Sequence, residues 1–399
     1  MSRRSWYGLG AALLCLALLP TGWLLLRRPP EPTPRLPVRT EQGCDALCGR
    51  TRAELNDFAG WLADNHARGY VGEVGWPDNR NGEAGEWNRI GEAWYEAADA
   101  AGLPVTAWST GEWWHNYKLA VYQGSPAGGL NRPNSQASVI ERHRATETVP
   151  RGVNVSGGEF SAPSVEPVST FSNGNPGVYD RDYHYDSQAS FDYLASRGAT
   201  LVRIPFRWER IQPELGGPLD RDELARLRAV VGRAHRAGLQ VVLDLHNFGA
   251  YYRFDGHQGI RLPLGSSQLP SDHLVDVWVR LSAAFRSHPG VLAYGIMNEP
   301  TGLPSGAGGL SPAQVWERSS QSVVEALRRH GDEKIIAVPG YDWSGVRGWS
   351  DTHPRGWIRD PRHNFVYEAH HYFDQHHAGE YKLTYAEELA DAERSGDGG

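Results

Sequence analysis

The chain has 399 residues, of which 40% are hydrophobic and 22% charged, with a formal net charge of −7 at pH 7. This composition excludes a disordered chain, and the length suits one large domain or two ordinary ones. Acidic and basic residues are interspersed, which argues against the clustered basic face of a nucleic-acid-binding protein, so we expect no nucleic-acid partner. The 15 Trp and 17 Tyr residues point weakly to a carbohydrate ligand, since aromatic rings stack on sugars as well as filling cores.

The N-terminal region carries an uncharged apolar stretch, residues 7–26, between two pairs of arginines. Twenty such residues can cross a bilayer. We expect residues 1–28 to be an uncleaved membrane anchor and the proline-rich residues 29–43 to be a stiff linker. A cleaved signal segment, which would give a secreted protein, is the alternative. In either case we expect the folded part to lie outside the cytoplasm.

Two cysteines, Cys44 and Cys48, precede the first predicted helix. Their spacing allows a local disulfide in an oxidising compartment, but two free thiols fit the sequence as well. The sequence lacks four ligands with the spacing of a zinc site, so we expect no metal and no cofactor.

Residues 51–114 have the pattern of two helix-then-strand units. Apolar positions at helical spacing predict helices over 51–68 and 87–101. The first strand, which begins at Gly69, has Glu73 at its tip between two glycines that leave room for a ligand. The second strand, 103–108, ends at Trp108. Residues 123–149 then change to Gly, Ser, Pro, Asn and charged residues, which predicts a long surface linker.

From residue 150 onward, six more strands alternate with helices. The strands are predicted over 152–156, 199–205, 239–245, 291–297, 334–338 and 365–372, and the helices over 190–197, 221–237, 272–288, 312–330 and 384–394. Eight strands that alternate with helices predict an α/β fold with a parallel sheet that closes into a (β/α)8 TIM barrel. Most strands end in a polar or aromatic residue: Glu73, Trp108, Asn154, Arg203, His246, Glu299 and His370.

Five motifs at these strand ends together resemble glycoside hydrolase family 5, which contains many endo-β-1,4-glucanases. They are Val-Arg-Ile-Pro-Phe-Arg-Trp-Glu-Arg-Ile-Gln-Pro at the end of 191–213, Leu-Asp-Leu-His-Asn-Phe at 243–248, Ile-Met-Asn-Glu-Pro at 296–300, Val-Pro-Gly-Tyr-Asp-Trp-Ser-Gly at 338–345 and Tyr-Glu-Ala-His-His-Tyr at 367–372. They resemble the family's second to sixth strand motifs in order.

The order of the remaining motifs departs from the family. The family places its nucleophile after the seventh strand and a sugar-stacking Trp after the eighth, whereas residues 70–75 and 106–114 resemble these motifs near the start of this chain. The resemblance therefore implies a circular permutant. Residues 44–399 would form one catalytic barrel domain, with strands seven and eight in 44–122, a joining linker in 123–149 and strands one to six in 150–399.

Two carboxyls that flank one glycosidic bond are sufficient for its hydrolysis. The resemblance implies that Glu299 is the general acid and base and that Glu73 is the nucleophile. Arg203 would keep Glu73 ionised and oriented, and Tyr372 could donate a hydrogen bond to it. The other expected substrate contacts are Asn298 to the sugar 2-hydroxyl, His246 and His370 to substrate or carboxylates, Trp108 beneath the sugar, and Trp113, Trp208 and Trp343 as further stacking candidates that packing would explain equally well.

Three other carboxylates are expected outside the catalytic pair. Glu368 lies two residues before His370 and shares its strand face, which places it one layer deeper in the barrel. Glu112 and Glu159 fall in loops, where we expect solvent exposure.

The sequence thus predicts a monomeric enzyme that hydrolyses β-1,4-glucosidic bonds of a β-glucan internally and with retention. A β-mannanase or mixed-linkage β-glucanase is the alternative within the family, because the catalytic set does not fix the sugar. An inactive, membrane-tethered polysaccharide-binding protein is the alternative of another class.

Overall fold

The computed structural model describes residues 44–160 and 168–395. The expected anchor and proline-rich linker lie outside the described residues. Within the described part of the chain, no helix has both the length and the apolar character needed to span a membrane.

The first third of the chain contains both predicted helix-then-strand units. Its elements are α2 (Ala46–Asp64), β1 (Gly69–Gly75), η1 (Asn79–Asn81), α3 (Ala84–Ala100), β2 (Val105–Thr110), β3 (Tyr122–Ser125), β4 (Gly129–Pro133) and α4 (Ala137–Ile140). Helix α2 begins where the Asp45 carboxylate accepts a hydrogen bond from the Cys48 backbone N–H at 3.0 Å, which satisfies one of the donors left free at a helix N-terminus.

The rest of the chain continues the alternation. Its elements are β5 (Arg151–Val155), β6 (Val168–Ser169), α5 (Gln188–Ser196), β7 (Leu201–Phe206), α6 (Trp208–Ile211), α7 (Arg221–Arg236), β8 (Gln240–Leu245), β9 (Ala250–Phe254), β10 (Gly259–Pro263), α8 (Ser271–Phe285), β11 (Val291–Gly295), α9 (Pro312–Arg329), β12 (Ile335–Pro339), α10 (Trp349–Thr352), β13 (Phe365–Tyr372) and α11 (Tyr385–Ser395).

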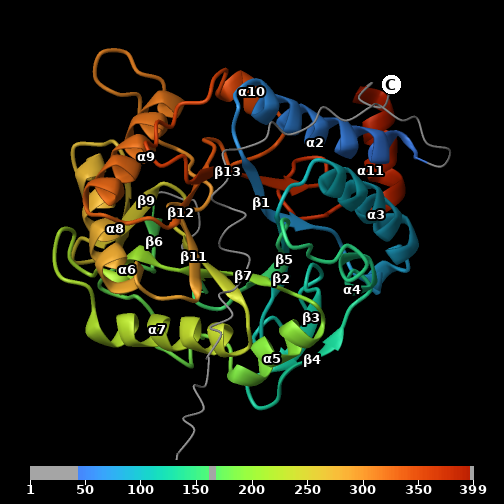
Figure 1. Ribbon diagram of the computed structural model, residues 1–399, viewed down its shortest axis with the longest axis horizontal. Helices are drawn as coiled ribbons and strands as arrows, with labels where there is room; N and C mark the ends of the chain where they lie inside the picture. The colour runs from blue at the N-terminus through green and yellow to red at the C-terminus, as the bar shows by residue number, and fades with distance from the viewer. Residues whose placement is uncertain (1–43, 161–167, 396–399) are drawn as a thin grey trace, which may run out of the picture.

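The central sheet is a closed barrel. Its strands follow the order β1-β13-β12-β11-β8-β7-β5-β2, and a pairing of β1 with β2 completes the ring. Every neighbouring pair in this ring is parallel. Helices α2, α3, α5, α7, α8, α9 and α11 surround the strands (Figure 1). The (β/α)8 barrel predicted from the sequence is therefore confirmed.

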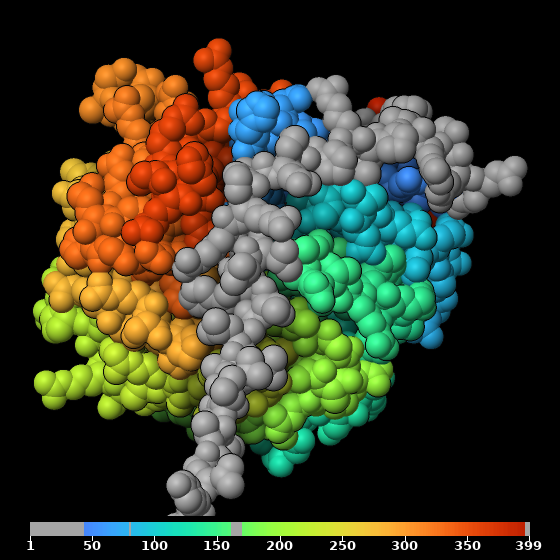
Figure 2. Space-filling view, viewed as in Figure 1, coloured from blue at the N-terminus to red at the C-terminus, as the bar shows by residue number. Residues whose placement is uncertain are grey.

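Strands β1 and β2, from the start of the chain, close the barrel between β13 and β5. Strand β1 runs beside β13, with Gly69 opposite Tyr367, and β2 runs beside β5, with Val105 opposite Arg151. Helix α2 packs against α10 and α11, so that the blue N-terminal residues lie beside the orange-red C-terminal ones in Figure 2.

The barrel interior changes from apolar to charged along its axis. Alternate residues of a strand face the same side, and the inward residues near the start of the strands form a small apolar cluster of Tyr70, Leu201, Val242, Ala293, Ile335, Ala337 and Val366. Two residues further along three of these strands come Arg203, Asp244 and Glu368, all fully buried. The next layer carries the polar side chains of the candidate site, at the carboxyl ends of the strands, where barrel enzymes carry out their chemistry.

The segment 123–149, expected as a surface linker, is partly folded. Strands β3 and β4 form a hairpin beside β2, and α4 follows. Leu130 and Val139 are buried, and the buried Gln136 amide donates to the backbone carbonyls of Trp76 and Lys118 at 2.9 and 3.0 Å. These contacts fix the segment against the loops after β1 and β2, a tertiary effect that its polar composition does not reveal.

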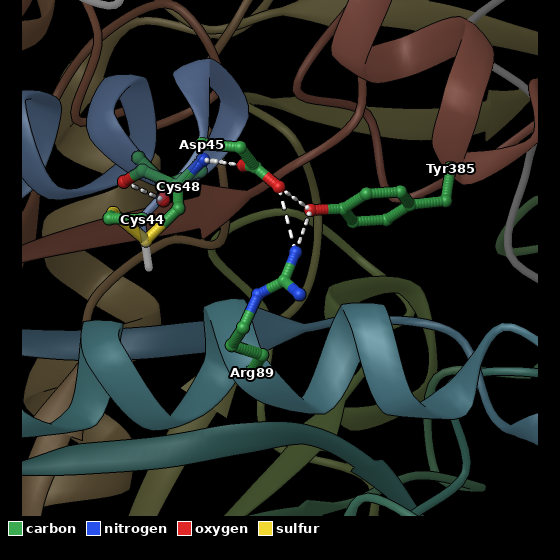
Figure 3. The surroundings of a disulfide bond; sticks show 6 residues. Cys44, Asp45, Cys48, Arg89 and Tyr385 are labelled. Carbon is green, nitrogen blue, oxygen red and sulfur yellow. Dashed lines mark hydrogen bonds and ion pairs between the residues drawn. A yellow bond between two sulfur atoms is a disulfide. The ribbon is translucent and has the colours of Figure 1, made fainter. Parts of the chain in front are cut away.

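Cys44 and Cys48 form a disulfide, which settles the choice that the sequence left open. Between them, Asp45 accepts hydrogen bonds from Arg89 on α3 and from Tyr385 on α11, at 2.8 and 2.5 Å (Figure 3). The start of α2 is therefore joined to two other helices at the point where the described chain begins.

Candidate active site

The centre of the site is Arg203, whose side chain is fully buried in the barrel. One guanidinium nitrogen, Nη1, donates to Glu73 Oε1 and to Asn154 Oδ1, both at 2.9 Å. The other, Nη2, donates to Asn298 Oδ1 at 2.7 Å. The guanidinium fork thus connects strand ends from β1, β5 and the β11 loop and fixes their side chains relative to one another.

Two further carboxylates lie deeper against the same guanidinium. Asp244 Oδ1 is 2.9 Å from Nη2 of Arg203, and Glu368 Oε1 is 3.0 Å from Nε. Burial raises the pKa of Asp244 to about 7, even though Arg203 acts against it. Glu368 lies one layer below His370, as strand alternation predicts. The same alternation places Asp244, two residues before His246, one layer below that histidine, although the sequence pattern did not mark Asp244 as a site residue.

Glu73 is 3% exposed and lies opposite His370 in the β1–β13 register, just after a register shift between Val71 and Glu73. Such irregularities re-aim side chains at the rims of barrels. Its second oxygen, Oε2, accepts a hydrogen bond from the Tyr372 hydroxyl at 2.6 Å. Burial raises the pKa of Glu73 to about 7, while His370, Arg203 and Tyr372 act to lower it.

Glu299 follows β11 and faces Glu73 across His370. Its backbone has φ = +42°, in the left-handed region that few residues other than glycine adopt. His370 Nδ1 is 2.7 Å from Glu299 Oε1 and 3.5 Å from Glu73 Oε2. One oxygen of Glu73 and one of Glu299 lie within 4.8 Å of each other. Burial lowers the pKa of His370, but the charge of Glu73 and hydrogen bonds to Glu299 and Glu368 outweigh it and raise that pKa to about 10.

The pKa of His246 is shifted in the opposite direction from that of His370. Burial lowers its pKa to about 3, so the ring is neutral at physiological pH. Its Nδ1 is 2.8 Å from Asp244 Oδ2, and its Nε2 is 3.3 Å from the Asn298 amide nitrogen. A proton on Nδ1 therefore bonds to Asp244, and Nε2 accepts from Asn298. This orients the Asn298 amide with its oxygen toward Arg203.

Two of the predicted aromatic residues border the site. Trp108 stacks on the His246 ring, with centroids 5.6 Å apart, and donates its Nε1–H to the Tyr117 hydroxyl at 3.1 Å. Trp343 is 41% exposed beside Phe248, with ring centroids 5.9 Å apart. Both rings retain surface that packing within the protein does not cover.

The other two tryptophans are less suited to stacking. Trp208 is fully buried and packs edge-on against Tyr251, so the expectation that it stacks on a sugar is wrong: core packing occupies the ring. Trp113 stacks on His184 with centroids 5.2 Å apart, which covers one of its two faces.

The two loop carboxylates expected to be exposed are buried. Glu112 is fully buried and accepts hydrogen bonds from the Ser187 backbone N–H, from the hydroxyls of Ser187 and Ser190, and from His184 Nε2 at 3.1 Å. Glu159 is 4% exposed, and its Oε2 accepts from the Gly157 N–H at 2.8 Å. Loops at the carboxyl end of a barrel pack over one another, and no sequence pattern in these two loops marks that packing.

Among residues 44–160 and 168–395, three groups of acidic and histidine side chains have ligand atoms close enough to share a metal ion. One is the group of Glu73, Glu299 and His370 at the candidate site. Another, Glu54 with His371 and His377, is organised by hydrogen bonds instead. Trp94 donates to His371 Nδ1 at 2.9 Å, which leaves the ring proton on the Nε2 that faces Glu54. That nitrogen is a donor here rather than a metal ligand.

Paired carboxyls at the carboxyl ends of barrel strands, beside an accessible tryptophan, define the class of barrel glycoside hydrolases. The family model "Cellulase (glycosyl hydrolase family 5)" matches residues 153–396, which is more than half of the chain. The chain belongs to this family.

Several known proteins are similar to it. The manganese dependent endoglucanase Eg5A of Phanerodontia chrysosporium is 30% identical over 240 residues, which cover 57% of this chain and 54% of that protein. Endo-beta-1,4-glucanase B of Emericella nidulans is 29% identical over 245 residues, which cover 61% of this chain and 65% of that protein. The structure of Pseudomonas stutzeri endoglucanase Cel5A matches this chain with 35% sequence identity and a TM-score of 0.49. The match covers 58% of this chain and 64% of the Cel5A chain. The chain spans about half the length of the first of these relatives.

Proposed function

We propose that this protein hydrolyses internal β-1,4-glucosidic bonds of cellulose or a related β-glucan, with retention of the anomeric configuration. The observation that carries the proposal is the closeness of Glu73 and Glu299, which have oxygens within 4.8 Å of each other. Retaining glycosidases separate their carboxyls by about 5–5.5 Å, whereas inverting ones leave about 6.5–9.5 Å for a water molecule. The named endo-β-1,4-glucanases among the relatives favour the glucan.

In this mechanism Glu73 attacks the anomeric carbon while Glu299 protonates the leaving oxygen. The sugar is then bonded covalently to Glu73, and Glu299 deprotonates the water that releases it. Arg203 and Tyr372 each hold one oxygen of Glu73, at 2.9 and 2.6 Å, and thus favour its ionised form. His370 lies beside both carboxyls, with Nδ1 2.7 Å from Glu299 and 3.5 Å from Glu73.

The remaining site residues would hold the sugar. The Asn298 amide is oriented by Arg203 and His246, and we assign it to the sugar 2-hydroxyl, a contact that strengthens in the transition state. Trp108 would stack beneath the sugar next to the cleaved bond. Trp343, which is exposed, would stack on a neighbouring sugar unit, and Trp113 would use its free face in the same way.

We further propose that the chain is a circular permutant of its family. The family model begins at residue 153 and the barrel strands β1 and β2 precede it, while the family's motifs for strands seven and eight resemble residues 70–75 and 106–114. Residues 44–399 would then be one catalytic domain, joined through 123–149. We propose a monomer outside the cytoplasm, attached to the membrane through residues 1–28 or secreted after their removal.

A substrate panel tests the function. Purified protein should release reducing ends from soluble cellulose faster than from mannan or lichenan, and should cleave cellopentaose internally. Faster cleavage of mannan would indicate a β-mannanase, and faster cleavage of lichenan would indicate a mixed-linkage β-glucanase. Assays with EDTA and with added Mn²⁺ address the manganese dependence in one relative's name. A Glu299→Gln variant is the matched control, since it keeps the fold and removes the acid.

The same samples separate the enzyme from a binding protein. Wild-type protein that binds cellohexaose but cleaves none of the three polysaccharides would favour the inactive polysaccharide-binding alternative. Proton NMR of early products should show the β-anomer first. An α-anomer that forms first would exclude the retaining mechanism.

A further inference from the structure

Glu368 is the buried carboxylate on β13 that the catalytic pair does not use. Its side chain is fully buried. Oxygen Oε1 is 3.0 Å from Arg203 Nε and 3.4 Å from His370 Nε2. It is therefore the shared partner of the two cationic groups that flank Glu73. We propose, on the basis of the proposed hydrolytic function, that Glu368 is a positioning residue that holds Arg203 and His370 against the Glu73–Glu299 pair.

The backbone of Gly72 on β1 lies directly against the Glu368 carboxylate. A Cβ atom built on Gly72 would lie 2.1 Å from Glu368 Oε1, so only glycine fits there. Gly72 precedes Glu73 and lies within the register shift of β1. The strand that carries Glu73 thus rests directly on the Glu368 carboxylate. Displacement of this carboxylate would move the Glu73 backbone as well as the two cations.

The other contacts of His370 show what Glu368 adds. Nδ1 lies between Glu299 and Glu73, at 2.7 and 3.5 Å. A ring with both nitrogens protonated donates in both directions at once, through Nδ1 to Glu299 and through Nε2 to Glu368. Without Glu368, the Nε2 proton loses this acceptor, and the ring is held from one side only.

Packing alone does not explain a carboxylate at this position. Its second oxygen, Oε2, has no hydrogen-bond partner among the described residues, and a buried ion pair is often no more stabilising than apolar residues of the same volume. The charge of Glu368 acts instead on its neighbours. The ionisable groups that face this cluster are Tyr70 and Glu73 from β1, Arg203 from β7, Asp244 from β8, Glu299 after β11 and His370 from β13.

The direction of the effect follows from these charges. Glu368 is one of the groups that raise the pKa of His370 to about 10. Removal of its charge lowers that pKa, so the imidazolium is lost at lower pH. Activity that depends on the imidazolium is then lost at lower pH too. We expect the basic limb of the kcat/KM profile to move down by about one pH unit in Glu368→Gln.

The kinetic test uses two isosteric variants. Glu368→Gln should reduce kcat on cellotetraose about 10²-fold, as expected for a misplaced catalytic group, with KM within about twofold because no sugar contact is removed. Glu388→Gln is the matched control. Glu388 on α11 is also a buried carboxylate with one oxygen that lacks a hydrogen-bond partner among the described residues, but burial raises its pKa, and it is not part of the site. It should leave kcat and the pH profile unchanged. A Glu368→Gln enzyme with wild-type kcat and pH profile would overturn the proposal.

A spectroscopic test does not depend on catalytic activity. In ¹⁵N-histidine-labelled wild-type protein, His370 should stay doubly protonated above pH 8, and it can be assigned by its absence from His370→Asn. A neutral His370 at pH 7 would refute the proposal. If wild-type protein cleaves no β-glucan, the proposed hydrolysis fails, but this titration, compared between wild type and Glu368→Gln, still decides whether Glu368 holds the ring charged.

Discussion

Replacement of Arg203 by methionine tests the charge balance on which the whole site depends. Arg203 is fully buried and is the cation nearest to three buried carboxylates: Glu73, Asp244 and Glu368, all within 3.0 Å. Methionine has a similar length but no charge and no donor. The variant therefore leaves three acidic groups in the barrel without their common partner.

The size of the loss can be worked from these contacts. Removal of one member of a buried ion pair costs about 3–5 kcal/mol, because the other charge stays buried and uncompensated. The hydrogen bonds from Arg203 to Asn154 and Asn298 add about 1 kcal/mol each. Two of the carboxylates can take up protons and so relieve part of the penalty. We expect the free energy of unfolding to fall by about 4–5 kcal/mol at pH 8.

The loss should shrink at acid pH. Arg203 acts to lower the pKa of Glu368 below 4.5, so this group stabilises the fold above pH 4.5 and loses that contribution at lower pH. Burial raises the pKa of Glu73 to about 7, so its protonated form stabilises the fold below pH 4.5, and this contribution is lost as pH rises through 7. Without Arg203, ionised Glu368 no longer stabilises the fold, and ionisation of the buried Glu73 costs more free energy. Both effects enlarge the difference between wild type and variant as pH rises from 4.5 to 8.

Guanidinium denaturation at pH 5 and pH 8 measures this difference, with Arg203→Lys as the control. Lysine keeps the charge but lacks the planar fork that reaches several acceptors at once. The decrease in the free energy of unfolding for Arg203→Lys should therefore be intermediate and less dependent on pH. An Arg203→Met protein as stable as wild type at pH 8, or one with the same loss at both pH values, would refute the reasoning.

Three further predictions concern other parts of the chain. Glu73→Ala should reduce kcat at least about 10⁴-fold, and azide should restore turnover as the α-glycosyl azide; an active variant would assign the nucleophile elsewhere. Cys48→Ser should lower the free energy of unfolding by about 2 kcal/mol, the loop-closure value for so short a loop, whereas equal denaturation curves with and without reductant would contradict this. Trp108→Ala should raise KM about tenfold, as expected for loss of one aromatic stacking contact, and Trp108→Phe should recover most of it; an unchanged KM would remove Trp108 from the sugar site.

The barrel was predictable because eight short apolar runs recur along the chain and amphipathic helices separate most of them. The number of strands and their parallel arrangement follow from this periodicity. The pairing of β1 with β13 was not visible in that pattern, because the residues are about 300 positions apart. Only the family motifs around Glu73 and His370 linked the two ends of the chain.

Residues on strands were easier to place than residues in loops. Alternation put Glu368 one layer below His370, and the structure agrees. Glu112 and Glu159 follow strands in polar loops, and their burial depends on other loops that pack over them. Trp208 lies within a family motif, but its neighbour Tyr251 comes from β9, in the small second sheet that the sequence did not predict.

The chain order ties the completion of the site to closure of the barrel. Glu73 bonds to Arg203 across 130 residues and to Tyr372 across 299 residues. Until β1 pairs with β13, Glu368 lacks the Gly72 backbone that packs against it, and the proposed catalytic pair of Glu73 and Glu299 is not assembled. Substitutions in this cluster should therefore affect the stability of the closed barrel and the chemistry together. Substitutions at Trp108 and Trp343, which border the site without joining the charged cluster, should affect substrate binding while leaving stability nearly unchanged.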